Sequence, residues 1–166
     1  TSERMLELMR RRNNVKRDLE LFTELSERGF ALGTDFITGH PGESEEIWQE
    51  AYATLEKFPL THLHAFTYSK RDGTPSATMK TEVKGDIAKE RLKSIEALIE
   101  SKNMTFRAKN NAIPLNVLVE EFKDDHYIGY DQFFNKVIIQ SSRDLLKEWV
   151  TIEKYEVKQE GNYAHF

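Results

Sequence analysis

The stretch Gly33-Thr34-Asp35-Phe36-Ile37-Thr38-Gly39-His40-Pro41-Gly42-Glu43 decides the fold, because it joins an apolar run to a loop that no helix would cross. The apolar and β-branched residues over positions 30–38 predict a buried strand. The cluster of glycine and proline that follows predicts a loop. A second run of the same kind, over residues 61–68, predicts another strand.

A helix is predicted between these two strands, from Ser44 to about residue 57. Ser44 is a suitable N-cap, and Glu45 and Glu46 suit the positive end of a helix dipole. Pro59 ends the helix. The apolar stripe consists of Ile47, Trp48, Ala51, Leu55 and Phe58. Two strands joined through a helix by short connections form a βαβ unit with parallel strands, so the sequence predicts a slice of an α/β sheet or barrel.

The regions on either side of this unit differ in pattern. Apolar positions at helical spacing predict helices over residues 4–9, 15–25 and 87–109. Beyond residue 110 the runs are short and β-rich, and they predict five strands in a small antiparallel barrel. The runs cover residues 115–121, 127–131, 134–140, 149–157 and 163–166. We therefore expect one domain over residues 1–110 and a second over residues 111–166.

Composition limits what the chain can do. It contains no cysteine, which excludes disulfides, thiolate zinc sites and cysteine-ligated iron–sulfur clusters within these residues. No apolar run approaches the roughly 20 residues that span a bilayer, and the first residues include neither an initiator Met nor an apolar signal segment. We therefore expect a cytoplasmic chain that has no membrane partner and is cut from something longer. The formal net charge of −4 gives no global attraction to nucleic acid.

The first predicted strand carries mostly small side chains on one face. Because side chains alternate across a strand, Gly33, Asp35, Ile37 and Gly39 share that face. Small residues let a ligand approach the backbone, and ligands of parallel α/β sheets bind beyond the C-terminal strand ends. The alternative is that the glycines only allow tight turns and close helix packing, while Asp35 accepts backbone hydrogen bonds. The residue pattern alone favours this alternative.

Two segments resemble motifs of the radical S-adenosylmethionine (SAM) methylthiotransferase family. Residues 34–43 are similar to the family's TD-I-GFPGE strand, with His40 where Phe is usual. Residues 66–79, Phe-Thr-Tyr-Ser-Lys-Arg-Asp-Gly-Thr-Pro-Ser-Ala-Thr-Met, resemble its F-YS-R-GTPAA-M segment and depart from it at Lys70, Asp72 and Ser76. The helix ending in Leu8-Met9-Arg10-Arg11-Arg12 is similar to the family's L--M-R helix, and the last domain resembles its TRAM module. The resemblance covers essentially the whole chain.

This resemblance implies a fold and a chemistry. The fold would be the C-terminal part of a partial TIM-type radical SAM barrel, followed by a five-stranded antiparallel TRAM or OB-like β-barrel. In such enzymes one [4Fe-4S] cluster cleaves SAM, the radical removes hydrogen from adenosine C2, and sulfur from a second cluster region and methyl from a second SAM are added. Both clusters need cysteines of the N-terminal region, including C-x-x-x-C-x-x-C. The resemblance therefore implies no catalytic residue and no metal ligand in this chain, which alone would be inactive.

The resemblance also assigns residues to the cofactor. Asp35, Ile37 and Gly39 would lie against the adenosyl part of SAM, and Tyr68 would stack or hydrogen-bond at the next strand end.

His62 and His64 share one face of their strand, but two ligands do not make a metal site. We expect packed or hydrogen-bonded histidines there.

Basic residues are the candidates for RNA contact. Arg71 would grip an RNA phosphate or a threonyl carboxylate, since guanidinium binds either group in a bidentate way. A solvated loop charge is the alternative. The patch of Arg10, Arg11 and Arg12 could hold the tRNA backbone. For this patch a solvated helix face is the favoured interpretation, because acidic residues lie nearby.

The substrate expected from the resemblance is tRNA. Leu63-His64 just before Phe66 looks most like the branch that modifies threonylcarbamoyladenosine beside the anticodon. The partners would then be the tRNA anticodon stem-loop and the missing N-terminal part of the same chain. Two alternatives stay open: an enzyme of the same family that modifies a ribosomal protein, and a non-catalytic RNA-binding or interaction module.

The predicted barrel carries the acidity of the chain. From residue 110 onward it has six Lys or Arg against ten Asp or Glu, which argues against RNA binding by the barrel alone. It would instead recognise its substrate by shape or dock on the catalytic domain. Aromatic side chains could still stack on bases, although core packing would explain several of them equally well. The candidates are Tyr127, Tyr130, Phe133, Phe134 and Tyr163.

Overall fold

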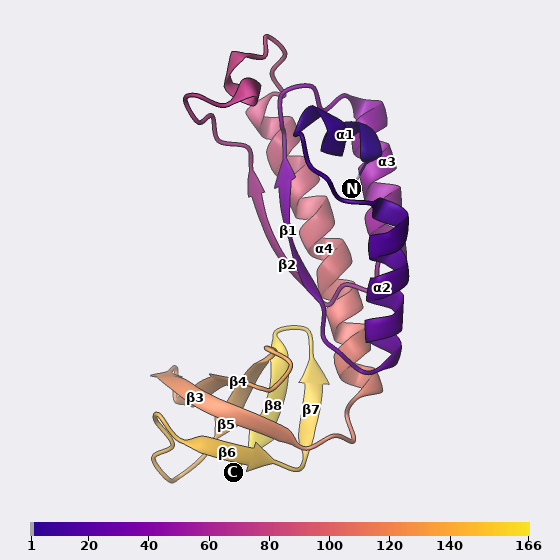
Figure 1. The fold of residues 1–166 in the computed structure, drawn as a ribbon. Helices are drawn as coiled ribbons and strands as arrows, with labels where there is room; N and C mark the ends of the chain where they lie inside the picture. Colours follow the sequence, from indigo (N-terminus) through magenta and orange to yellow (C-terminus); the bar gives the residue numbers. More distant parts are fainter. Residues whose placement is uncertain (1) are drawn as a thin grey trace. The chain divides into compact units, whose positions relative to one another are not determined.

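The computed structural model describes residues 2–166 and shows two compact units (Figure 1). Unit 1 is Thr1–Lys102 and unit 2 is Asn103–Phe166. The division falls inside the long helix α4 (Gly85–Lys109), a little before the boundary expected near residue 110. In the described part of the chain, we find no helix with the length and apolarity that crossing a membrane requires.

Unit 1 is built around two parallel strands. Its elements in chain order are α1 (Glu3–Leu8), α2 (Val15–Glu27), β1 (Gly33–Thr38), α3 (Glu45–Lys57), β2 (His62–Thr67), the 3₁₀ turn η1 (Pro75–Thr78) and the first part of α4. Strands β1 and β2 pair in parallel through the crossover helix α3, which confirms the predicted βαβ unit.

Local signals in the sequence set the helix ends of unit 1. The Ser44 side chain accepts a hydrogen bond from the Ile47 backbone N–H at 3.3 Å, as an N-cap does. The Asn14 side chain does the same for the Arg17 N–H at 2.9 Å, and so starts α2. Gly29, with φ of 86°, follows the end of α2 in the left-handed region that glycine adopts without strain.

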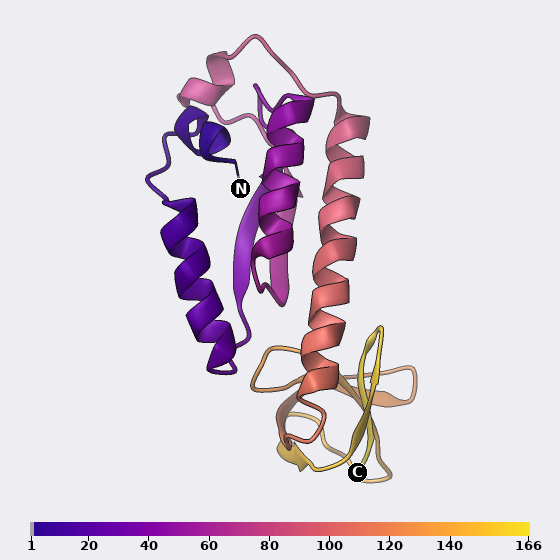
Figure 2. The same cartoon turned by 90° about the vertical axis from the view of Figure 1, so that its right-hand side faces the viewer.

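The core of unit 1 lies between the sheet and two helices. Phe36 of β1 packs with Trp48, Ala51 and Leu55 of α3, with Leu60, and with Ile95 and Ile99 of α4. Ile95 and Leu60 are almost completely buried. Helices α3 and α4 run side by side over this face (Figure 2). One face of the two-stranded sheet is thus covered by helices.

Unit 2 is a curled sheet of six strands, which corrects the prediction of five antiparallel strands. The strands are β3 (Leu115–Lys123), β4 (His126–Tyr130), β5 (Lys136–Gln140), β6 (Trp149–Ile152), β7 (Tyr155–Lys158) and β8 (Gly161–His165). Their order in the sheet is β6-β3-β4-β5-β8-β7. Strand β5 pairs with β8 in parallel, and the other neighbours are antiparallel.

The difference arises from a break that the sequence pattern hides. The run over residues 149–157 was expected as one strand, but it stops after Ile152 and restarts at Tyr155. Strand β6 then pairs with β3 at one edge, while β7 forms a hairpin with β8 at the other edge. One apolar run therefore supplies both edges of the sheet.

The inner side of unit 2 is apolar and the last turns of α4 belong to it. Its buried cluster consists of Leu115, Val117, Val119, Val137, Ile139, Leu145, Val150, Ile152 and Ala164. Arg107 of α4 is 4% exposed and donates to Asn103 Oδ1, Asn162 Oδ1 and the backbone oxygen of Lys158. A buried polar network thus ties the end of the helix to the sheet.

Candidate ligand site on the parallel strands

The two motif segments of the sequence lie next to each other in unit 1. The register pairs Asp35 with His64 and Ile37 with Phe66. Beyond the strands, the Tyr68 backbone N–H donates to the Thr38 oxygen at 2.7 Å, so the pairing continues to the loops. The C-terminal ends of β1 and β2 therefore lie side by side, together with the loops that follow them.

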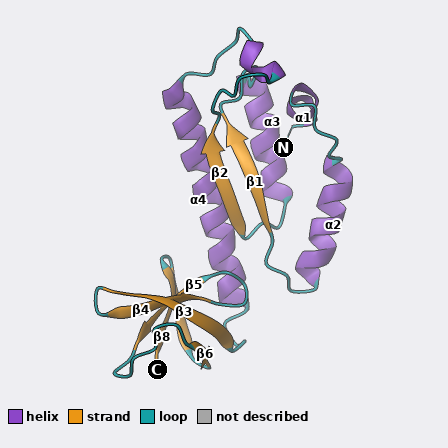
Figure 3. Cartoon of the chain, turned by 60° about the vertical axis from the view of Figure 1, so that its left-hand side comes forward, coloured by secondary structure: helices purple, strands orange, loops and turns teal. Residues whose placement is uncertain are grey.

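The two faces of this sheet differ in cover. On the face opposite to the helices, β1 presents Gly33, Asp35 and Ile37, and β2 presents His62, His64 and Phe66. Figure 3 shows β1 and β2 from this side, with α3 and α4 behind them. We call it the open face. The side chains of Asp35 and His64 are 78% and 80% exposed, and Phe66, near the end of β2, is 39% exposed.

Polar and aromatic side chains contact each other on the open face. His64 Nδ1 lies 3.6 Å from Asp35 Oδ1, across the two strands. The His64 ring also meets Phe66 edge to face, with centroids 4.8 Å apart. His62 shares a hydrogen bond of 2.8 Å with Thr61 Oγ1, as expected for a bonded histidine. Within residues 2–166 no group of three acidic, histidine or cysteine side chains is arranged to hold a metal ion.

The loop after β1 is fixed by a buried ion pair. Glu43 Oε1 accepts a hydrogen bond from the Gly39 N–H at 3.0 Å and another from Arg91 Nη1 at 2.6 Å. The side chains of Glu43 and Arg91 are 4% and 7% exposed. Arg91 also bonds Glu45 and lies 5.4 Å over the ring of Trp48. The pair therefore holds both ends of the loop against α3 and α4.

Gly39 has a packing reason of its own. Its φ is 76°, and a Cβ at this position would lie 2.6 Å from the Cβ of Ala88 on α4. The neighbouring Thr38 hydroxyl donates to the Ala88 oxygen at 3.1 Å. Close approach of the helix thus requires glycine here, as the structural alternative in the sequence predicted.

The unusual His40 is buried at the edge of the strands. It is 1% exposed, shares a hydrogen bond of 2.7 Å with Ser76 Oγ, and meets the Tyr68 ring at 5.2 Å. Within the described residues, His40 Nδ1 and the Tyr68 hydroxyl are buried without a hydrogen-bond partner. Burial lowers the pKa of His40 below its ordinary 6.5, against the opposing effects of the Pro41 backbone and Glu43. The imidazole is therefore mainly neutral at pH 7.

The four residues expected at the cofactor line two different cavities. Asp35 and Ile37 line a cavity of about 530 Å³, together with Phe66 and residues of α1, α2 and α3. Gly39 and Tyr68 line a second one of about 290 Å³, near η1 and the start of α4. The structure brings the members of each pair together, and it separates the two pairs.

The arginines expected at RNA lie on the surface of unit 1. Arg71 is exposed in a turn that the Thr74 hydroxyl closes by donating to the Arg71 oxygen at 2.8 Å. Arg10, Arg11 and Arg12 are exposed after α1, and Arg10 has a positive φ of 54°. Arg11 lines the larger cavity. No ion pair within the described residues neutralises any of these four side chains.

Unit 2 carries a line of outward side chains that sequence reasoning found only in part. The register places Leu118 of β3 opposite both Tyr130 of β4 and Trp149 of β6. The Phe134 ring stacks on Tyr130 at 5.4 Å. We call Leu118, Tyr130, Phe134 and Trp149 the aromatic row, in which Leu118 is the one aliphatic member. Trp149 and Phe134 are 70% and 75% exposed, so the row presents broad apolar rings to solvent.

The other expected aromatics have partners inside unit 2. Tyr127 packs against the apolar core, and Phe133 meets Phe106 edge to face. Tyr163 donates to Glu160 and lies under the Lys158 ammonium group. Trp149 was not singled out from the sequence, although its place before the buried Val150 in an alternating strand is the signal for an outward side chain.

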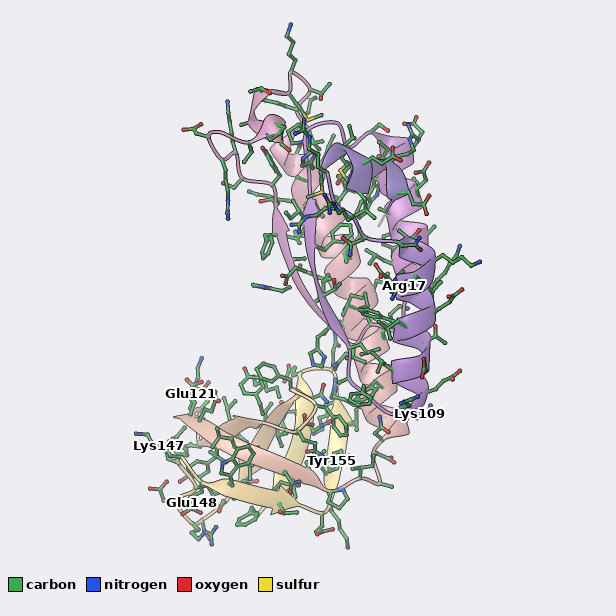
Figure 4. The ribbon with its side chains drawn as sticks, viewed as in Figure 1. Arg17, Lys109, Glu121, Lys147, Glu148 and Tyr155 are labelled. Atoms are coloured by element: carbon green, nitrogen blue, oxygen red, sulfur yellow. The ribbon has the colours of Figure 1, made fainter. Side chains whose placement is uncertain are left out.

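Charged residues of both signs border the aromatic row. Lys136 lies opposite Tyr130 in the register, and Lys147 comes shortly before Trp149. Figure 4 shows Lys147, Glu121 and Glu148 at one edge of unit 2, and Tyr155 at the other. Glu148 is paired with Arg143 at 3.1 Å, whereas neither Lys136 nor Lys147 forms an ion pair within the described residues. Two lysines without an ion pair in the described residues therefore lie next to the row.

Comparison with known proteins finds relatives that are similar in sequence. No family model matches the sequence. The chain is 46% identical to a "Putative methylthiotransferase" of Helicobacter pylori, over 98% of the chain and 39% of that protein. It is 29% identical to the threonylcarbamoyladenosine tRNA methylthiotransferase MtaB of Bacillus subtilis, over 92% of the chain and 35% of the relative. It is 33% identical to the tRNA-2-methylthio-N(6)-dimethylallyladenosine synthase of Zymomonas mobilis, over 84% and 32%. The chain spans less than two fifths of the length of these three relatives.

Proposed function

The chain belongs to the methylthiotransferase family, and we propose that it is the C-terminal portion of a radical SAM enzyme that modifies tRNA. The reaction would add a methylthio group to C2 of N6-threonylcarbamoyladenosine beside the anticodon. The observation that carries the proposal is the pairing of the two motif segments, whose strands end side by side and whose loops follow there. Ligands of parallel α/β folds bind at this C-terminal end of the strands.

The substrate is the finer part of the proposal. One relative is named for threonylcarbamoyladenosine and another for dimethylallyladenosine, and the chain resembles both to a similar extent. The Leu63-His64 pair before Phe66 supports the threonylcarbamoyl substrate, because it resembles that branch of the family. His64 is exposed on the open face, where a ligand can reach it.

The open face offers groups that fit SAM. Ile37 provides an apolar surface for adenine, and the exposed Asp35 carboxylate suits ribose hydroxyls or the cationic groups of SAM. Gly39 and Tyr68 would contact the ligand only from the second cavity, beyond the strand ends. When bound at a reduced [4Fe-4S] cluster, SAM supplies the radical for such reactions. This chain has no cysteine and does not fit either cluster, so both would be held by another part of the protein.

Residues of both units are candidates for RNA contact. The aromatic row would stack on unpaired bases, and Lys136 and Lys147 would meet phosphates next to it. In unit 1, Arg71 and the patch of Arg10, Arg11 and Arg12 would contribute phosphate contacts. A second candidate substrate is a basic ribosomal protein, which the excess of acidic residues from residue 110 onward favours.

Mass spectrometry of nucleosides tests the function. Transfer RNA from cells without the gene should lack the methylthio derivative of threonylcarbamoyladenosine. Threonylcarbamoyladenosine without the methylthio group should accumulate instead. Loss of a methylthio group from dimethylallyladenosine instead would keep the enzyme class and change the substrate. Unchanged tRNA together with a mass shift of a ribosomal protein would overturn the tRNA assignment.

A further inference from the structure

The open face carries two residues to which the proposed function gives no defined part in SAM binding. Asp35 on β1 is assigned to SAM, but its neighbours on β2, His64 and Phe66, are not. The three side chains form a chain of contacts, from Asp35 to His64 at 3.6 Å and from His64 to Phe66 at 4.8 Å between ring centroids. Both strands therefore contribute to the surface around the Asp35 carboxylate.

In water this arrangement contributes little to folding. An exposed contact between an imidazole and a carboxylate adds little to stability, and 3.6 Å is longer than an ordinary hydrogen bond. Phe66 keeps more than a third of its surface exposed, so part of its apolar area stays in water. Stability of the described unit thus explains only part of why these residue types lie at neighbouring positions of the two strands.

A bound ligand changes the balance. When a ligand displaces water from the open face, the local dielectric constant falls and a hydrogen bond from the His64 N–H to the Asp35 carboxylate becomes stronger. The edge-to-face contact with Phe66 restricts the His64 ring, so less side-chain freedom is lost on closing the pair. An imidazole N–H directed at Oδ1 would leave Oδ2 of Asp35 free to accept from a donor of the ligand.

We infer that His64 is a positioning residue, which holds the Asp35 carboxylate in the orientation that SAM requires while Phe66 restricts the His64 ring. The role rests on the proposed SAM binding and deepens it, because it extends the cofactor surface from β1 to β2. His64 acts through Asp35 and makes no contribution to SAM affinity once the carboxylate is absent.

A double-mutant cycle in the full-length, cluster-containing enzyme tests this role. The readout is the Kd for SAM by equilibrium dialysis, with the KM for SAM and kcat as a second measure. His64→Ala should raise the Kd about three- to tenfold, which corresponds to one lost hydrogen bond, and leave kcat within about twofold. Asp35→Ala should raise it at least as much. The double variant should match Asp35→Ala, since coupled residues are not additive.

Two further variants separate positioning from a general packing role. His64→Gln keeps an N–H donor and should recover most of the affinity, whereas His165→Ala, an exposed histidine of unit 2, should leave the Kd unchanged. Additive losses in the cycle, or a Gln variant as weak as the Ala variant, would overturn the role of His64. Wild-type enzyme that binds no SAM would instead contradict the proposed function itself.

Discussion

The faces of the sheet are covered differently in the two units. The sheet of unit 2 curls around its own core, and every member of its apolar cluster is less than 9% exposed. The sheet of unit 1 has one face covered by α3 and α4, and its other face presents Asp35, His64 and Phe66 to solvent. Packing therefore explains the inward residues of both units. It does not explain the open face of unit 1, which is the face that we propose for SAM binding.

Among the described residues, Arg91 of unit 1 and Arg107 of unit 2 are buried, and their partners differ. Arg91 of unit 1 meets the carboxylates of Glu43 and Glu45 at the motif loop. Arg107 of unit 2 donates to amide and backbone oxygens. The first side chain balances the buried Glu43 carboxylate, and the partners of the second include Asn162 Oδ1 and the backbone oxygen of Lys158. The comparison predicts a larger penalty for losing Arg91.

Replacing Arg91 with methionine should have the largest effect. It leaves the Glu43 carboxylate buried without its cation, and breaking a buried ion pair costs about 3–5 kcal/mol. Denaturant unfolding should show this loss, and hydrogen exchange should place it in unit 1. The double change Glu43→Gln with Arg91→Met should recover part of the stability. A loss below about 1 kcal/mol in the single variant would show that the pair does not hold the loop.

Arg107→Met should destabilise unit 2 by about 2–3 kcal/mol, because it leaves the buried Asn162 Oδ1 and the backbone oxygen of Lys158 without their donor. Exchange should then increase in β7 and β8, next to Lys158 and Asn162. Arg143→Met is the control, since Arg143 pairs with Glu148 at the surface and should change stability by about 0.5 kcal/mol or less. Equal effects of the two arginine variants would remove the distinction between the buried and the exposed site.

The arrangement around the motif loop was predictable as far as it depends on neighbouring residues. Alternation placed Asp35 and Ile37 on one face, and Ser44 marked the start of α3 as observed. Arg91 was missed, although its spacing from Ala88 and Ile95 puts it on the buried side of α4. A single arginine in an apolar stripe was the available signal for a buried ion pair.

Contacts between distant residues could not be read from local pattern. The partner of His40 is Ser76, and no periodicity connects positions so far apart in the chain. The parallel pairing of β5 with β8 and the break between β6 and β7 depend in the same way on which strand reaches which edge. The sequence therefore predicted the type of most elements in unit 2 but not their order in the sheet.

His40→Phe should produce a smaller effect that depends on pH. Because burial lowers the pKa of His40 in the folded state, the unfolded chain takes up the proton first as the pH falls below 6.5. The wild type should lose stability in that range, and the Phe variant should lose less. Urea unfolding at several pH values between 7 and 5 measures the difference. His165→Gln should keep the wild-type dependence, and an unchanged slope in His40→Phe would show that His40 is not the group responsible.

Trp149→Ala should have the smallest effect on stability, within about 0.5 kcal/mol, because its side chain is exposed on the outer face of unit 2. The neighbouring Val150→Ala should cost about 1.5 kcal/mol, since Val150 points into the core. In the full-length enzyme, Trp149→Ala should nevertheless weaken binding of an anticodon stem-loop RNA by about 1–3 kcal/mol, the contribution of a stacked base. Fluorescence anisotropy would measure this binding. If Trp149→Ala bound the RNA as tightly as the wild type, the aromatic row would not stack on RNA bases. Of the two exposed surfaces, only the open face of unit 1 would then keep a proposed ligand.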